Sequence, residues 1–297
     1  MQIVKTFLSI LVFVLLSACV STSVKESTLG TIDVSPEMVL NSSPLGEGTE
    51  NLDLSSVDIL EMTPEMIEFV ESYMEGSTNR YRRMQRLVYA IIGDGNFDLV
   101  YDDKTRTASE TFTAARGNCL SFTNLFIAMA RYLEIHAEYQ EVDIPPDWSL
   151  AGESFFFSQH VNVLVDLGVG MQRVVDFNIY DFQPTYERRT ISDARGRAHY
   201  FSNIGVEHMM NGNNKLSYAN FLQALKEDIR FSPAWINMGI LHRREKYPNY
   251  AETSYKQALE IYQFNLIAMS NLANLYEEEG KSEWAEQYKD RVRLHRM

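Results

Sequence analysis

Cys119 is the residue with the clearest potential for chemistry in this sequence. It follows Gly117-Asn118 and begins a segment whose apolar residues recur at helical spacing, so we expect its thiol at the first turn of a helix. The positive end of the helix dipole favours a thiolate there, and the thiolate is the reactive form of cysteine. Cys119 is therefore a candidate nucleophile. The alternative is a buried thiol that takes no part in chemistry.

A histidine and an aspartate could supply the base and the group that orients it. The alternating apolar pattern of residues 159–178 predicts a β-hairpin with its turn at Gly168. If Gly168 is the centre of the turn, His160 and Asp176 lie opposite each other, with Cβ atoms about 5 Å apart. The Asp176 carboxylate could then bind one imidazole nitrogen and leave the other to face Cys119.

Two other aspartates, Asp166 and Asp181, compete with Asp176 for the orienting role. A histidine without such neighbours is more often a core residue that bonds to backbone or tyrosine. In a complete triad, the backbone N–H of Cys119 would donate to the oxyanion formed during acyl transfer. No second donor can be identified from the sequence.

Three blocks of residues in this order resemble the transglutaminase-like superfamily of papain-fold cysteine enzymes. They comprise Tyr101 with Thr105, Thr107, Ala108 and Glu110, then Gly117-Asn118-Cys119 with Leu125 to Ala137, then the segments around His160 and Asp176. The resemblance covers about residues 60–190, and Glu134 stands where the family often has glycine. It implies a thioester on Cys119, formed from a peptide or protein amide and passed to water or to an amine. It implies no cofactor.

The last hundred residues repeat with a period of 34. Small residues recur at this spacing, as at Gly205, Gly239 and Ala273, and aromatic residues recur between them, as at Phe221 and Tyr255. This pattern resembles three tetratricopeptide repeats over about residues 198–297. Such repeats would recruit a protein partner.

An asparagine also recurs at this period, as Asn203, Asn237 and Asn271. In the repeat family this position lies on the inner concave surface, where an asparagine ladder can bind an extended peptide. The alternative is that each asparagine only satisfies its own helix pair.

The N-terminus resembles a bacterial lipoprotein signal. Lys5 precedes an apolar run, Phe7 to Leu16, that is too short to span a bilayer. The run ends in Leu16-Ser17-Ala18-Cys19, which resembles a lipobox and implies lipid modification of Cys19. Val20 implies the outer membrane, with the protein facing the periplasm. The alternative is a plain secretory signal cleaved after Ala18. Structural cysteines usually pair in the oxidising periplasm, and Cys119 has no partner in the sequence.

The sequence therefore predicts an α+β papain-like domain followed by an all-α repeat domain. The predicted parts are a signal peptide (1–18), a flexible tether (19–58), a transglutaminase-like domain (59–195) and a tetratricopeptide repeat domain (196–297). The net charge of −13 comes without a basic block, which excludes nucleic acid as a partner. No spacing of histidines and cysteines predicts a metal site.

Two functions remain open at this point. The first is a membrane-anchored cysteine enzyme that acts on peptide or protein amides, with hydrolysis preferred because water is the abundant acceptor. The second is a lipoprotein scaffold that has lost catalysis and only binds peptides or proteins.

Overall fold

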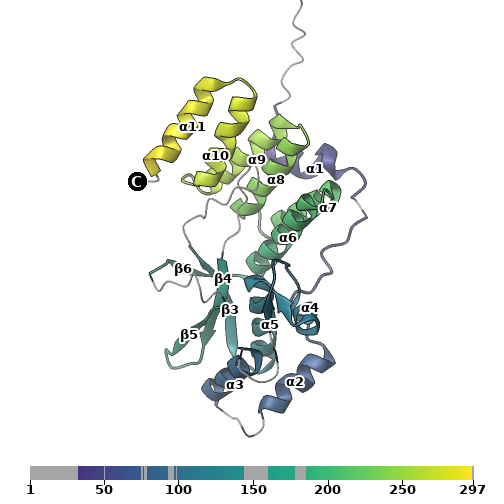
Figure 1. Cartoon of the computed structure of the whole chain (residues 1–297), viewed down its shortest axis with the longest axis vertical. Coiled ribbons are helices and arrows are strands. Elements are labelled where there is room, and N and C mark those ends of the chain that lie inside the picture. The colour runs from purple at the N-terminus through teal and green to yellow at the C-terminus, as the bar shows by residue number, and fades with distance from the viewer. Residues whose placement is uncertain are drawn as a thin grey trace, which may run out of the picture. The chain divides into compact units, whose positions relative to one another are not determined.

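The computed structural model describes residues 33–49, 51–74, 76, 79–92, 97, 99–143, 160–177 and 185–295 (Figure 1). Within these residues, a helical part precedes a small sheet and a second helical part follows it. The first part contains α1 (Pro36–Asn41), the 3₁₀ helix η1 (Pro44–Gly46), α2 (Pro64–Met74), α3 (Arg80–Ile92), β1 (Val100–Tyr101), α4 (Ala108–Ala114), β2 (Arg116–Gly117) and α5 (Cys119–Tyr132). No helix of the described residues is both long and apolar enough to cross a membrane.

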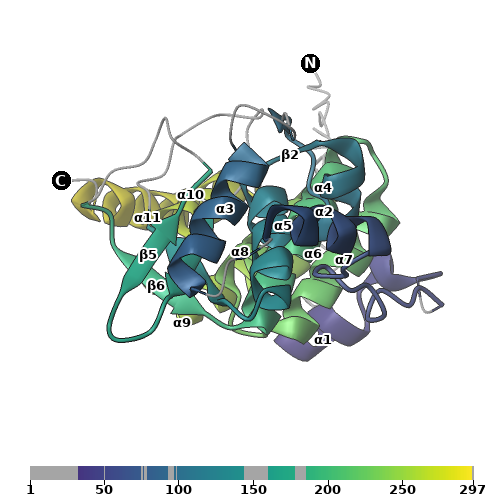
Figure 2. The ribbon, with the colours of Figure 1, turned by 90° about the horizontal axis from the view of Figure 1, so that it is seen from below.

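The main sheet is antiparallel and has the strand order β5-β4-β3-β6. Its strands are β3 (His136–Val142), β4 (His160–Asp166), β5 (Gln172–Val175) and β6 (Arg188–Ile191). The buried helix α5 lies between this sheet and helices α2 and α4 (Figure 2). Thr123 of α5 donates to the carbonyl of Val161 in β4, at 3.3 Å. The expected mixed helix-and-sheet fold is thus confirmed.

The β4–β5 hairpin has a different register from the predicted one. The strands pair Val163 with Val175, which centres the connection on Val169, and extending this register places Asp176 opposite Asn162. The predicted direct pairing of His160 with Asp176 is therefore wrong, because the connection is centred one residue later than the predicted turn at Gly168. The shift of partner is two residues, so both side chains keep the same face of the sheet.

Glu134 has a left-handed backbone conformation, which explains why glycine is common at this position in the family that the sequence resembles. Glu134 follows the end of α5 and has a φ of 57°, a region that glycine occupies without strain. The chain turns from α5 into β3 at this point, and the turn is kept although glycine is not.

The C-terminal region consists of packed helix pairs whose length matches the 34-residue period. The helices are α6 (Asp193–Met210), α7 (Asn214–Glu227), α8 (Ser232–Arg244), α9 (Pro248–Ile261), α10 (Leu266–Glu278) and α11 (Ser282–His295). A Cβ on Gly205 would overlap Phe221, and a Cβ on Gly239 would overlap Tyr255. The recurring glycines therefore allow close helix crossings. The predicted domain boundary between residues 195 and 196 falls inside α6.

The prediction of a flexible tether is wrong from Asp33 onwards. Helix α1 begins with Ser35 as its N-cap, and Val39 is fully buried against the C-terminal helices. Ser43 Oγ lies 2.8 Å from Nε2 of the buried His242, and the Tyr218 hydroxyl donates to the Val39 carbonyl at 2.9 Å. Few apolar residues anchor this segment, so its composition resembles that of a linker. Residues 1–32, with Cys19, lie outside the described residues.

Candidate active site

Cys119 is the first residue of α5, as predicted, and its side chain is half-buried. Asn118 is the N-cap, and its Oδ1 accepts the backbone N–H of Ser121 at 3.0 Å. A Cβ on Gly117 would overlap the Ser121 side chain, which explains the glycine two residues before the cysteine. The thiol therefore lies at the positive end of a 14-residue helix.

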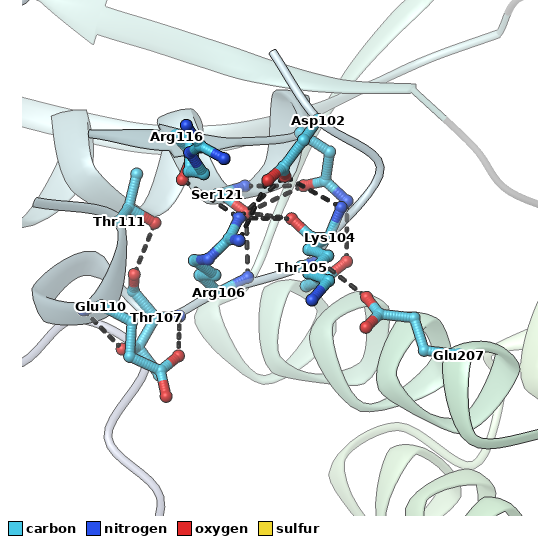
Figure 3. Close-up of polar contacts among 11 residues, drawn as sticks. Asp102, Lys104, Thr105, Arg106, Thr107, Glu110, Thr111, Arg116, Ser121 and Glu207 are labelled. Carbon is cyan, nitrogen blue, oxygen red and sulfur yellow. Dashed lines mark hydrogen bonds and ion pairs between the residues drawn. The ribbon is translucent and has the colours of Figure 1, made fainter. Parts of the chain in front are cut away.

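A polar network fixes the loop that holds this helix start (Figure 3). Asn118 donates its backbone N–H to the Lys104 carbonyl at 3.2 Å and its Nδ2 to Thr105 Oγ1 at 2.7 Å. Ser121 Oγ accepts the N–H of Arg106 at 2.9 Å, and the Arg106 guanidinium forms a two-bonded ion pair with Asp102. Residues 102–106 and 118–121 thus form one rigid support for the nucleophile.

His160 and Asp176 form a close, buried pair. Nε2 of His160 lies 2.8 Å and 3.0 Å from the two Asp176 oxygens, and the side chains are 7% and 8% exposed. Asn162 donates its Nδ2 to the same carboxylate at 2.8 Å. The ring of Phe177 packs against Phe122 of α5 and so anchors the residue after Asp176. Asp176 is therefore held as an acceptor for His160.

Nδ1 is the ring nitrogen of His160 that does not bond to Asp176, and Cys119 lies close enough to influence the pKa of this imidazole. Burial by itself lowers the pKa of His160. The hydrogen bonds to Asp176 and Cys119, together with their negative charges, outweigh it and raise this pKa from 6.5 to about 9. The imidazolium form is therefore favoured at neutral pH, and it can stabilise a thiolate.

Tyr101 supplies a hydroxyl at the nucleophile, which the sequence did not reveal. The parallel pairing of β1 with β2 places Tyr101 beside Gly117, and Tyr101 lies close enough to Cys119 for the two groups to interact electrostatically. Burial raises the pKa of Tyr101 to about 12, aided by the charges of Cys119 and nearby aspartates. The hydroxyl therefore stays protonated and can donate. It is a candidate for the second oxyanion donor, beside the N–H of Cys119.

Replacing Tyr101 with phenylalanine is expected to separate two reactions of Cys119. Acylation by p-nitrophenyl acetate develops charge on a carbonyl oxygen and should slow by about 10²–10³, whereas alkylation by iodoacetamide develops none and should change by less than about threefold. Stopped-flow release of nitrophenolate and mass spectrometry of the labelled protein measure the two rates. Tyr132→Phe, which removes an exposed hydroxyl bonded to Glu71, is the control. Equal slowing of both reactions would show that Tyr101 only supports the fold.

The other predicted site residues have different outcomes. Asp166 lies at the far end of β4, where its Oδ1 accepts the N–H of Gly168 at 2.8 Å, so it caps the hairpin turn and does not orient His160. Asp181 lies outside the described residues. The described residues contain no cluster of three or more side chains that could hold a metal ion.

The asparagine ladder does not form an exposed groove. Asn237 and Asn271 are 1% and 0% exposed, and Asn203 is half-buried. Asn237 donates to Ser202 at 3.1 Å, and Asn271 donates to the Ile267 carbonyl at 3.1 Å. Both hydrogen bonds lie inside the helical region. They fit the alternative in which the asparagines bond to neighbouring helices and not to a bound peptide.

Comparison with known families agrees with the geometry. Residues 67–164 match the profile of the transglutaminase-like superfamily. This range contains Cys119 and His160, and Asp176 follows it. Residues 67–164 are therefore similar to a transglutaminase-like domain, and a helical region lies C-terminal to them. None of the curated proteins with which it was compared matches it.

Proposed function

We propose that this protein is a cysteine enzyme that cleaves peptide or protein amides through a thioester on Cys119. One observation carries the proposal: His160 is paired with the buried Asp176 carboxylate, and Cys119 lies close enough to help raise the pKa of the same imidazole. A nucleophile, a base and an orienting group in this order form the arrangement that activates a thiol for acyl transfer. The match to the transglutaminase-like superfamily supports this reading.

The proposed reaction has two steps, acylation of Cys119 and hydrolysis of the resulting thioester. The Cys119 thiolate attacks the carbonyl carbon, and the C=O electron pair moves to oxygen. The backbone N–H of Cys119 and the hydroxyl of Tyr101 donate hydrogen bonds to this negatively charged oxygen. The His160 imidazolium gives its proton to the leaving amine as the C–N bond breaks. The neutral imidazole then takes a proton from water, whose oxygen attacks the thioester. The acid leaves, and the Cys119–His160 pair is restored.

A cavity between the sheet and the helical region is a candidate peptide site, and neither Cys119 nor His160 is among the residues that line it. Its volume is about 650 Å³, and Val142, the neighbour of His160 across β3 and β4, lies in its wall. Arg195, Arg230 and Tyr262 of the helical region line the opposite side. Polar and aromatic side chains around such a volume suit a peptide.

We propose further that Cys19 carries a lipid anchor, which would place the domain at the periplasmic face of a bacterial outer membrane. The basis is the lipobox resemblance at Leu16 to Cys19. The C-terminal helix pairs, read as tetratricopeptide repeats, would recruit a protein partner or substrate. Their period and the glycine crossings at Gly205 and Gly239 support this.

The test uses the mature full-length protein with p-nitrophenyl acetate as acyl donor and biotin-cadaverine as competing amine. We expect an acetyl adduct on Cys119, its loss to water more than to the amine, and no adduct with Cys119→Ala. Biotin-cadaverine acetylated in preference to hydrolysis would show a transamidase instead. Absence of any adduct would overturn the enzyme proposal and favour the scaffold. Capture on Cys119→Ala in periplasmic extract, analysed by mass spectrometry, then identifies the natural substrate.

A further inference from the structure

Helix α6 of the C-terminal region bonds to both halves of the candidate active site. Near its end, Glu207 Oε1 accepts the backbone N–H of Thr105 in the nucleophile loop at 2.7 Å (Figure 3). Two turns earlier, His199 Nε2 lies 2.7 Å from Glu141 Oε1 in β3. Glu141 directly precedes Val142, the Cα partner of His160. One helix therefore spans from the support of Cys119 to the support of its base.

The Glu207 contact reaches Cys119 in two steps. Thr105 is 5% exposed, so its N–H requires a partner inside the protein, and Glu207 provides one from 102 residues away. The same Thr105 accepts Nδ2 of Asn118, which is the N-cap of α5. Without Glu207, a buried N–H would be unsatisfied, and the loop would move to reach another acceptor. Asn118 and the helix start would move with it.

The Glu141 contact fixes the part of the candidate site that carries His160. Glu141 is 2% exposed and accepts from His199 and from Arg195 Nε, at 2.8 Å. Burial alone raises the pKa of Glu141, but the bonds and charges of His199 and Arg195 outweigh it and lower this pKa well below its usual range. A buried carboxylate with two partners on one helix holds β3 firmly against α6. The strand that carries His160 pairs with β3 along its whole length.

We infer that Glu207 is a positioning residue for Cys119, and that α6 holds the nucleophile loop and the histidine strand at a fixed separation. The C-terminal region is then part of the catalytic unit and not only a recruiting module. A partner that binds the C-terminal helices more tightly when α6 holds this position would shift the protein toward that position, in which the nucleophile loop is held for reaction. This inference rests on the proposed function only in taking Cys119 and His160 to react together.

The test compares Glu207→Ala with Glu207→Gln, whose amide oxygen can still accept from Thr105. Cys119 alkylation by iodoacetamide across pH and acylation by p-nitrophenyl acetate are measured on the full chain. We expect Glu207→Ala to slow both at pH 7 by about 10- to 100-fold and to move the alkylation profile to higher pH. Glu207→Gln should stay within about threefold of the wild type, since it restores the bond. Glu260→Ala, at an exposed position of α9, is the matched control.

A second variant separates positioning from general loss of stability. Thr253→Val removes a 2.7 Å bond to the Val34 carbonyl, far from Cys119 in the fold, and should lower the melting temperature without moving the alkylation profile. The inference is overturned if Glu207→Ala reacts like Glu260→Ala, or if Thr253→Val slows Cys119 equally. If Glu207→Ala does not fold, Glu207→Asp, one methylene shorter, should show the same shift at smaller size. Should the wild type alkylate rapidly but never acylate, the proposed function fails while the Glu207 effect on alkylation still supports the inference.

Discussion

His160→Ala is expected to slow the alkylation of Cys119 by iodoacetamide at pH 7 by about 100-fold, and to abolish turnover of amides. In the wild type, His160 is protonated at this pH, because Asp176 and Cys119 raise its pKa from 6.5 to about 9. Removal of the imidazolium takes away the positive charge that stabilises the thiolate and the proton that the leaving amine needs. The alkylation profile should therefore move to higher pH in the variant.

The raised pKa of His160 also predicts how the wild type responds to pH. The folded state binds this proton more tightly than the unfolded state, since its pKa lies above 6.5. The stabilising contribution is therefore complete below pH 6.5 and is lost as pH rises through about 9. Acyl transfer from an amide should fall over the same upper range, because the imidazolium proton is no longer present. Denaturant unfolding at a series of pH values, with initial rates in the same buffers, measures both effects.

His136→Ala serves as the control for these measurements. His136 lies at the start of β3, its side chain is 63% exposed, and it lies 3.5 Å from the Glu138 carboxylate. It should leave the alkylation profile and the upper pH limb unchanged. An alkylation profile shared by the wild type and His160→Ala would show that the two side chains do not act together in solution, and the scaffold function would then be preferred.

The local part of this site could be predicted from the sequence. The helix start at Cys119 follows from its apolar spacing, and the two strands of the hairpin follow from their alternation. The predicted register was wrong by two residues, because Gly168 and Gly170 both mark a turn but do not decide its centre, which lies at Val169. The side chains of His160 and Asp176 still meet, because a shift of two residues keeps both on the same face of the sheet.

The long-range part of the site could not be predicted. Tyr101 reaches Cys119 through a two-residue parallel strand pair, which is too short to give a periodic signal. Glu207 meets Thr105 across 102 residues, and its sequence context reads as an ordinary helix surface. The segment around Val39 docks through a few apolar side chains and a Ser43–His242 bond, so its composition predicted a tether. Tertiary contacts of this kind leave no local pattern.

Asp176→Asn is expected to reduce acyl transfer by about 10²- to 10⁴-fold while leaving the fold intact. The Asp176 carboxylate accepts Nε2–H of His160 and Nδ2–H of Asn162 at the same time. An asparagine amide has one acceptor oxygen and one donor NH₂, so one of these two partners must face an N–H group. The imidazole would then lose its orientation or its tautomer. Loss of the negative charge would also lower the pKa of His160, and the upper limb of the pH–rate profile should move down from about 9.

Asp166→Asn is the matched control, because Asp166 is the other acidic residue of the same strand pair. Its Oδ1 accepts the N–H of Gly168, and an amide oxygen can do the same, so activity and the pH limb should not change. The rate is measured with p-nitrophenyl acetate, and the upper pH limb is measured with an amide substrate once one is trapped. If Asp166→Asn shifted the upper limb of the pH–rate profile and Asp176→Asn did not, Asp176 would not be the residue that orients His160. The orienting role would then belong to the hairpin turn. Both variants replace an aspartate with an asparagine, but only Asp176 bonds to His160. A difference between the two variants therefore measures the effect of the His160–Asp176 contact.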